Sequence, residues 1–265
     1  MHESGVLYIF AFAFGAVIGS FLNVFIHRWP LEESIVRPGS HCPSCDRPIP
    51  WYWNIPVLSW ILLRGKCRWC GERISVRYPL VEAITGIWAV VMLYKFGPSV
   101  SAVVIFAFGA GLFAASLIDL EHMLLPDIVT IGFIPVGLAM SFIPERYTPA
   151  WPVTATESLV GAITGAGLFL VVLLLFKYLT GKEGMGLGDV KLMGSIGAFI
   201  GYQGLPPAIM VGGFGGIVAW VWMAALSSAD RDRPVPFGPF LSLGAIVVIL
   251  LREWMEHNWI IIKWM

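Results

Sequence analysis

Long apolar stretches separated by short polar segments cover most of the chain. Several run for about 20 residues with almost no charge, the length that a helix needs to cross roughly 30 Å of hydrocarbon. A soluble core would not bury so many of them. The pattern predicts an all-α membrane protein with about eight transmembrane helices, at approximate residues 5–26, 79–95, 100–119, 125–143, 156–179, 188–202, 207–226 and 238–252.

The composition agrees with this prediction, because 57% of the residues are hydrophobic and the mean hydropathy is +0.78. The first span has no preceding basic residue and no small-residue cleavage site, so we expect it to remain as a helix rather than be removed as a signal peptide. The formal net charge of zero argues against a nucleic-acid partner. The sequence leaves the oligomeric state open.

Basic residues set the expected orientation, because positively charged loops stay on the cytoplasmic side of a membrane. The predicted spans leave only Lys95, Arg146, Arg252 and Lys263 outside, and place the rest of the 17 Lys and Arg residues inside. The inside residues are Arg28, Arg37, Arg47, Arg64, Lys66, Arg68, Arg73, Arg77, Lys177, Lys182, Lys191, Arg231 and Arg233. The first eight, in the loop between the first two spans, also predict attraction to anionic headgroups of the lipid bilayer.

All four cysteines lie in that same loop, residues 27–78, as two CxxC pairs. They are Cys42, Cys45, Cys67 and Cys70, with 21 residues between the pairs. Two such pairs complete the tetrahedral S₄ shell of a structural zinc site. Two disulfides or buried thiols are the alternatives, but disulfides are disfavoured in a reducing cytoplasm. A loop of about 50 residues buries little core, so a metal ion is the expected source of its stability.

Two aspartates stand at the ends of apolar segments. Asp119 ends the segment AVVIFAFGAGLFAASLID, and Asp189 ends the glycine run GMGLGD. An ionisable side chain at membrane depth is costly, so it indicates function rather than packing. The predicted topology puts both near the cytoplasmic face, where two carboxyls sharing a proton activate water against a peptide carbonyl. The sequence therefore predicts an intramembrane aspartyl protease with Asp119 and Asp189 as its catalytic pair.

The glycine run before Asp189 predicts an irregular backbone. Gly184, Gly186 and Gly188 alternate with other residues, a pattern that disfavours a helix and permits close approach of another chain. Irregular backbone at membrane depth is tolerated where it lines a polar cavity. We expect Gly186 and Gly188 to support the active site, the alternative being a flexible loop between two spans.

Three polar neighbours of the aspartates have simpler interpretations. Asp127 follows Pro126 and is predicted to cap the next helix. His122 is interpreted as an interfacial histidine outside the catalytic set. Lys191 lies two residues after Asp189, on a different helix face, so we expect no ion pair between them and attribute Lys191 to snorkelling or to the charge rule.

Segments along nearly the whole chain resemble the prepilin peptidases, the membrane aspartyl proteases with a GxGD motif that serve type IV pilus and type II secretion systems. The resemblance rests on GxxxGSFLNVFIHRWP from Gly15, CPSC with CRWC, RYPLVEAITG, LIDLEHMLLPD, GMGLGDVKLM and VPFGPFL. It implies a multi-pass protein of the bacterial inner membrane that cleaves the basic leader from prepilins or pseudopilins on the cytoplasmic side. The family's protease carboxylates map onto Asp119 and Asp189. In many members the new amino terminus is then N-methylated with S-adenosylmethionine.

The resemblance also suggests two domains, an N-terminal methyltransferase part over residues 1–95 and a six-helix protease part over residues 96–265. Asn23, Arg28, Glu82 and Gly86 are candidates for contacting S-adenosylmethionine, and their alternative is ordinary structure: an interfacial hydrogen-bonding pair, an acid at a membrane end and a packing glycine. A protease without methyltransferase activity, a zinc-stabilised scaffold of the secretion apparatus and a transporter remain as other interpretations. The scaffold leaves the two aspartates unexplained, and a transporter would need paired helix breaks in inverted repeats.

Overall fold

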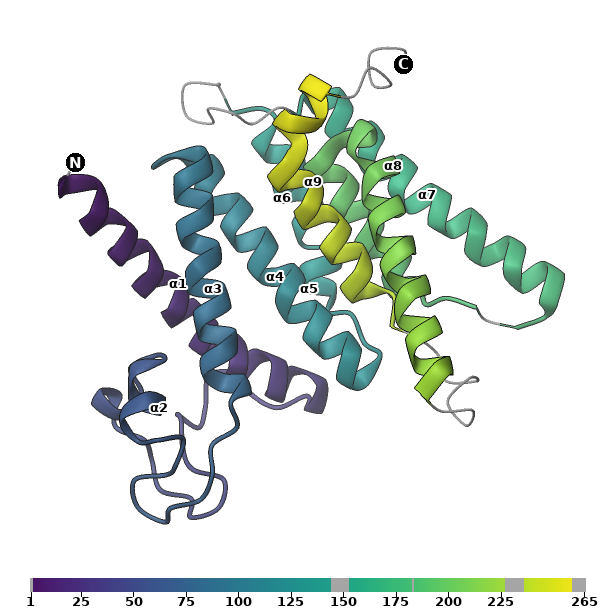
Figure 1. Ribbon diagram of the computed structural model, residues 1–265. Helices are drawn as coiled ribbons and strands as arrows, with labels where there is room; N and C mark the ends of the chain where they lie inside the picture. The colour runs from purple at the N-terminus through teal and green to yellow at the C-terminus, as the bar shows by residue number, and fades with distance from the viewer. Residues whose placement is uncertain (1, 144–152, 183, 227–235, 259–265) are drawn as a thin grey trace. The chain divides into compact units, whose positions relative to one another are not determined.

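The computed structural model describes residues 2–143, 153–182, 184–226 and 236–258 (Figure 1). In these ranges the backbone is helical or irregular, and the only strand-like pairing is two isolated bridges in the cysteine loop. The prediction of an all-α fold is confirmed. Five residues named above lie outside the described ranges: Arg146, Arg231, Arg233, Lys263 and Val235, the first residue of VPFGPFL.

The chain divides into two compact units, Met1–Ala110 and Gly111–Met265. The first contains α1 (His2–Arg28), α3 (Arg77–Phe96) and the beginning of α4 (Val100–His122). The loop between α1 and α3 holds the cysteines and three short helices: η1 (Trp29–Leu31), η2 (Trp51–Trp53) and α2 (Leu58–Leu62).

Small residues bring α1 and α3 into close contact. A Cβ atom on Gly15 would lie 2.7 Å from the carbonyl oxygen of Thr85, and one on Gly19 would lie 2.7 Å from the Cα atom of Glu82. No side chain fits at these distances. The GxxxG spacing of Gly15 and Gly19 therefore serves close helix packing, as its pattern indicates.

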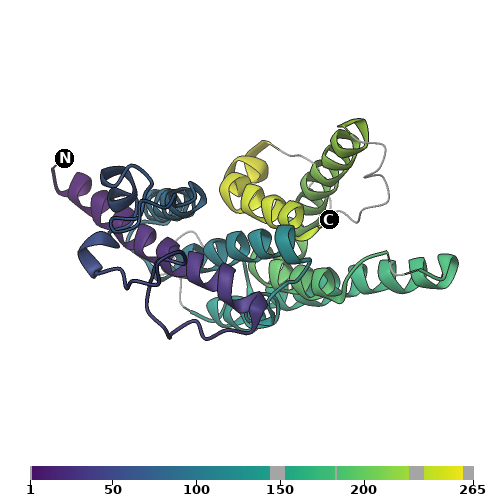
Figure 2. The same ribbon diagram turned by 90° about the horizontal axis from the view of Figure 1, so that it is seen from below.

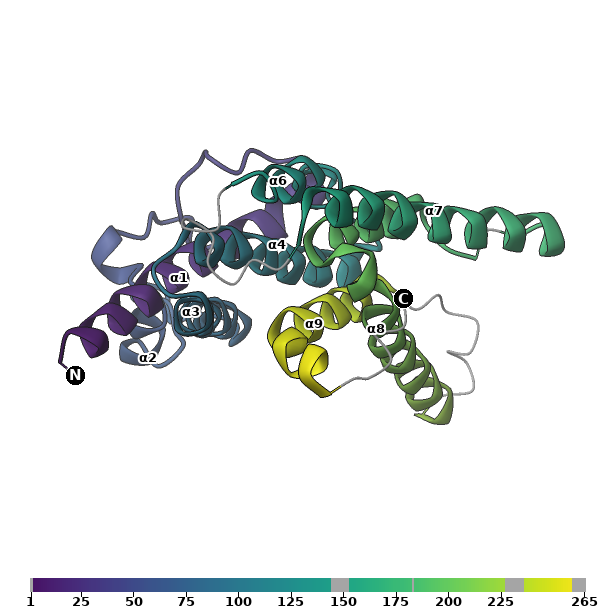
Figure 3. The ribbon, with the colours of Figure 1, turned by 90° about the horizontal axis from the view of Figure 1, so that it is seen from above.

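Within its described residues, the second unit contains the end of α4 and five further helices. They are α5 (Asp127–Thr130), α6 (Phe133–Met140), α7 (Ala155–Thr180), α8 (Leu187–Leu226) and α9 (Gly238–Asn258). The first part of α8 packs on α7, where the buried Ser158 hydroxyl donates to the Ala198 carbonyl at 2.7 Å. The later part of α8 lies beside α9 (Figure 2). The C-terminal part of α7 extends beyond the other helices drawn for this unit, and its side chains are largely exposed (Figure 3).

The predicted number of eight spans is not confirmed. Within the described residues, five helices are long and apolar enough to cross a membrane: α1, α3, α4, α7 and α8. The predicted spans 188–202 and 207–226 belong to α8, which is interrupted at Gly201, where φ is 69° and ψ is 170°. The segments Asp127–Met140 and Gly238–Arg252 are shorter apolar helices.

The predicted span 125–143 is broken into α5 and α6. Pro135 stands in the first turn of α6, and its ring nitrogen cannot donate to the Ile131 carbonyl. That carbonyl accepts instead from Ile134 N–H at 3.1 Å. A continuous helix through this segment is therefore unfavourable, which the apolar pattern alone did not reveal.

Candidate active site and metal centre

Asp119 is buried on the last turn of α4, with 5% of its surface exposed. Its Oδ2 atom accepts a buried hydrogen bond of 3.0 Å from the backbone N–H of Gly238. Gly238 is the first residue of α9, where backbone N–H groups have no partner within the helix. The start of α9 therefore holds the Asp119 carboxylate in one orientation.

Asp189 is buried in the first turn of α8, with 9% of its surface exposed. Its backbone N–H donates to the Gly186 carbonyl at 3.2 Å. Its Oδ1 atom is buried and has no hydrogen-bond partner among the described residues. The Asp189 carboxylate also lies close enough to that of Asp119 for the two to interact electrostatically. The structure therefore brings together the two aspartates that the sequence singled out.

Small residues leave room around this pair. A Cβ atom on Gly238 would lie 2.7 Å from Asp119 Oδ2, so a side chain there would displace the carboxylate. Gly186 is more open, because its Cβ would be 3.9 Å from Asp189 Oδ2. A Cβ atom on Gly188 would lie 3.1 Å from the Leu125 side chain, and one on Gly238 would lie 3.0 Å from it. The Leu125 side chain therefore lies between the starts of α8 and α9.

The glycine run is irregular only in part. Residues 184–186 have no helical assignment, as expected, but α8 begins at Leu187 and includes Gly188. The expectation that Gly188 belongs to an irregular stretch is therefore wrong. Its lack of a side chain serves packing against Leu125 in the first helical turn.

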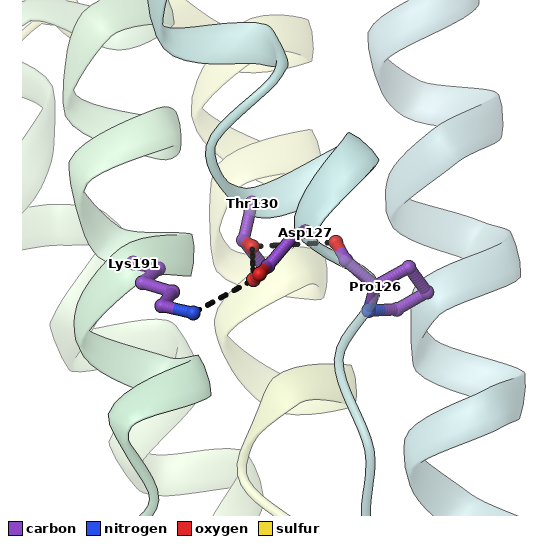
Figure 4. Close-up of polar contacts among 4 residues, drawn as sticks. All are labelled: Pro126, Asp127, Thr130 and Lys191. Atoms are coloured by element: carbon purple, nitrogen blue, oxygen red, sulfur yellow. Dashed lines mark hydrogen bonds and ion pairs between the residues drawn. The ribbon is translucent and has the colours of Figure 1, made fainter. Parts of the chain in front are cut away.

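Asp127 and Lys191 form an ion pair (Figure 4). Lys191 Nζ donates to Asp127 Oδ1 at 2.8 Å, and the Thr130 hydroxyl lies 3.4 Å from the same oxygen. Asp127 was predicted to cap the helix, but α5 has Pro126 at its N-cap and no side-chain cap. Lys191, which the sequence attributes to snorkelling or to the charge rule, has as its partner an acid 64 residues earlier in the chain.

Two contributors to this site were missed from the sequence. Gly238 lies within the segment VPFGPFL, and its hydrogen bond to Asp119 spans 119 residues. The dipeptide Gly238-Pro239 before an apolar run is a signal for a helix start, but no local pattern tells which acid that start will face. Leu125 carries no signal beyond being apolar.

The four candidates for contacting S-adenosylmethionine lie in the first unit and have partners within the chain. Asn23 Nδ2 donates to the Tyr78 carbonyl at 3.1 Å, and Glu82 Oε2 accepts from Val57 N–H at 2.7 Å. Arg28 Nη1 donates to the carbonyls of Ser34 and Pro38 at 3.1 and 2.8 Å. Gly86 packs against the Phe12 ring. Their polar atoms therefore serve internal contacts.

The four cysteines come together in the same unit. Their Sγ atoms all lie within 4.8 Å of one another, and those of Cys42 and Cys70 are 3.8 Å apart. Four sulfurs about 2.3 Å from one zinc ion at the corners of a tetrahedron are separated by about 3.8 Å. The cluster therefore has the dimensions of an S₄ metal site.

The two CxxC pairs have the same backbone fold. Cys42 N–H donates to the Arg47 carbonyl at 3.0 Å, and Cys67 N–H donates to the Glu72 carbonyl at 2.7 Å. In each turn, which we call a knuckle, the residue after the second cysteine has a positive φ: 56° at Asp46 and 74° at Gly71. Equivalent positions lie 25 residues apart, so residues 40–49 and 65–74 form an internal structural repeat.

Without a bound cation, the thiols of Cys67 and Cys70 differ strongly in pKa. Backbone N–H groups of Cys70 and Trp69 lower the pKa of the Cys67 thiol to about 6. The Glu72 backbone acts in the same direction on Cys70, but burial and the neighbouring cysteines outweigh it and raise the pKa of Cys70 to about 12. Four thiolates cannot share so small a space unless a cation balances their charge. The cluster is therefore suited to a metal ion.

Comparison with known proteins agrees with these observations. Residues 13–96 match the Bacterial Peptidase A24 N-terminal domain, and residues 105–221 match the Type IV leader peptidase family. A prepilin leader peptidase/N-methyltransferase of Xanthomonas campestris pv. campestris is 40% identical, over 88% of this chain and 88% of the relative. Proteins with the same name from Stutzerimonas stutzeri and Aeromonas salmonicida are 36% and 34% identical, over 94% and 90% of this chain and 92% and 89% of their own lengths. No solved structure matches the chain significantly. Identity at this level over most of the length shows that the chain belongs to the type IV leader peptidase family.

Proposed function

We propose that this protein is a membrane aspartyl endopeptidase that removes the basic leader from type IV prepilins or pseudopilins and then N-methylates the new amino terminus. The relatives named above carry both activities in their names. The main support for protease activity is that the Asp119 and Asp189 carboxylates, at the ends of two apolar helices, are buried and close enough to interact electrostatically.

Proteolysis by this pair requires a water between the two carboxyls. One carboxylate accepts a proton from the water as it attacks the scissile carbonyl, and the other carboxyl donates a proton to the tetrahedral intermediate. The buried Asp189 Oδ1 has no other partner among the described residues, and such an oxygen is costly unless water or substrate satisfies it. The Gly238 N–H keeps Asp119 Oδ2 in place during proton transfer.

The central experiment replaces each aspartate by asparagine in the full-length protein. Asp119→Asn and Asp189→Asn should each abolish cleavage of a purified prepilin, because an amide cannot exchange the proton. Asp46→Asn is the matched control, since Asp46 is exposed in the cysteine loop and asparagine tolerates its positive φ. Measurable turnover by either variant of the pair, in folded protein, would refute the catalytic assignment.

We place cleavage at the cytoplasmic face of the inner membrane. The uneven distribution of Lys and Arg supports this placement, and a prepilin presents its junction between basic leader and apolar helix at that depth. Water must reach the carboxyls there, which would be harder at the bilayer centre.

S-adenosylmethionine is the proposed methyl donor, and each of the four candidate residues already has a contact within the chain. One polar atom each of Asn23, Arg28 and Glu82 is bonded to a backbone group of the chain, and Gly86 packs against Phe12. We therefore derive no step of methyl transfer from them. Cleavage and methyl transfer, measured separately on the same purified prepilin, distinguish the bifunctional enzyme from a protease alone.

The cysteine cluster is proposed to bind one structural zinc ion. The cluster has four protein ligands and the dimensions of a tetrahedral shell, so it leaves no open position for catalysis. Its knuckles belong to the first unit, and Asp119 and Asp189 belong to the second.

A further inference from the structure

The segment between the two knuckles is apolar although it belongs to a polar loop. Residues 48–63 contain no charged side chain, and Arg47 and Arg64 flank them directly. Most of the large apolar side chains here are exposed, up to 80% for Trp51 and 72% for Leu62. The exposed set is Trp51, Tyr52, Ile55, Leu58, Ile61 and Leu62. A run of exposed apolar side chains of this kind indicates an interaction site.

A hydrogen bond holds the middle of this segment beside α3. Val57 N–H donates to Glu82 Oε2 at 2.7 Å. Glu82 lies five residues into α3, which corresponds to about 7.5 Å along the axis from Arg77 at a rise of 1.5 Å per residue. The segment thus returns from the knuckles to the side of a membrane-spanning helix, and Figure 1 draws α2 beside the lower part of α3 and above the knuckle loops.

The surface of α3 at this depth is already apolar. Leu80, which precedes Glu82, is 52% exposed, and Ile84 and Ile87 continue the exposed apolar surface along the helix. Because α3 has 20 residues, it needs nearly all of its length to cross the hydrocarbon. The level of Glu82 is therefore inside the bilayer boundary and not in the aqueous loop.

The two ends of the segment are tied to the knuckles. Asn54 Nδ2 donates to the Ser40 hydroxyl at 3.3 Å, and Trp60 Nε1 donates to the Ile74 carbonyl at 3.0 Å. Val57 stands between them with φ at 62°, a costly conformation for a β-branched residue that persists where the surroundings impose it. These contacts therefore fix the segment on both sides of a turn near Val57. We call residues 51–62 the wedge.

We propose that residues 51–62 insert into the interface between headgroups and acyl chains of the leaflet at the C-terminal end of α1. The occupant of the exposed apolar surface is phospholipid. Trp and Tyr side chains favour this interface, and Arg47, Arg64 and Lys66 at the base of the wedge suit anionic headgroups. The knuckles thereby have a further attachment to the membrane besides α1 and α3. This inference does not depend on the proposed catalytic activity.

Fluorescence quenching in nanodiscs tests the inference on the full-length protein. A small fluorescent amino acid replaces Leu62 in one variant and Arg68 in a control, since Arg68 is an exposed residue of the second knuckle. Phospholipids brominated near the headgroup should reduce the emission at position 62 by about half or more, and aqueous iodide should have little effect there. Position 68 should show the reverse. Quenching of position 62 by iodide alone would overturn the proposal.

Two further measurements keep the result unambiguous. The same probe at Leu58 provides an independent reading if the variant at position 62 fails to fold, with full metal content as the criterion of folding. Purified prepilin is then added to the nanodiscs. Unchanged quenching by brominated lipid supports a lipid-facing surface, whereas loss of that quenching on addition of prepilin would assign the surface to the substrate helix and refute the inference.

Discussion

The ion pair between Asp127 and Lys191 shows how single residues connect the two proposed catalytic aspartates. Lys191 follows Asp189 by two residues, and Asp127 follows Asp119 by eight. The pair joins α5 to the first turns of α8, where the buried Ser195 hydroxyl also donates to the Val129 carbonyl at 3.3 Å. An exposed pair of this kind contributes only about 0.2–1 kcal/mol to stability. Its effect should therefore be on positioning.

Neutralising this pair should slow cleavage moderately. Asp127→Asn and Lys191→Gln are each expected to reduce kcat/KM by about fivefold, which corresponds to about 1 kcal/mol of lost transition-state stabilisation. The double variant should be no slower than either single variant, because both remove the same interaction. Lys182→Gln removes an exposed charge between α7 and α8 and should leave kcat/KM unchanged. Losses that multiply in the double variant would show that the two residues act separately.

At this scale the sequence predicted residue types better than partners. The cost of an acid at membrane depth marked Asp119 and Asp189, and both are buried and close enough to interact electrostatically. The same local reasoning failed for Asp127 and Lys191. Position after a proline suggested a cap, and an i, i+2 spacing excluded only a contact with Asp189. A partner 64 residues away is a property of the tertiary fold.

Among the helices, the start of α9 has the most direct link to the site. The Gly238 N–H holds Asp119, and a methyl group at Gly238 would meet the carboxylate at 2.7 Å. Gly238→Ala should therefore lower kcat by about a hundredfold, the size expected when a catalytic group is displaced by about 1 Å. Gly213→Ala is the matched control, since a Cβ there has no atom within 4 Å. Equal activity of the two variants would show that α9 does not position Asp119.

The geometry of the two knuckles predicts the metal content of the protein. Wild-type protein should contain about one zinc ion per chain, and Cys42→Ser with Cys45→Ser should lower this to near zero, because only two thiolates remain. Limited proteolysis should then cut the loop between α1 and α3 faster, since a loop of this size has little core of its own. Full resistance to proteolysis together with full activity after complete chelation would show that the ion is dispensable.

The sequence predicted the two knuckles better than it predicted the ends of the helices. The CxxC spacing acts over four residues, so the two knuckles could be expected from the sequence alone. Hydropathy, in contrast, cannot distinguish a continuous apolar helix from one interrupted near Pro135, as the predicted span 125–143 shows. The break between α5 and α6 therefore removes one predicted span, two others belong to α8, and Gly238–Arg252 is a shorter apolar helix.

For the whole molecule, the distribution of basic residues predicts which ends of the helices face the cytoplasm. A cysteine introduced at Pro98, in the exposed turn between α3 and α4, should react with a membrane-impermeant maleimide in intact spheroplasts. A cysteine at Lys182, between α7 and α8, should react only after permeabilisation. Wild-type protein with its metal bound gives the background from the native cysteines. Labelling of position 182 in intact spheroplasts would reverse the topology and with it the proposed side of cleavage.

The internal repeat of the two knuckles has a consequence for biosynthesis. Each knuckle supplies only two sulfurs, so the metal site is incomplete until the ribosome has released the chain beyond Cys70. By then the apolar α1 has already been synthesised, whereas α3, which starts at Arg77, has only begun to emerge. The proposed metal ion can therefore bind at the earliest between the insertion of the first and second membrane helices, and the supply of metal at that moment should influence whether the nascent chain assembles correctly.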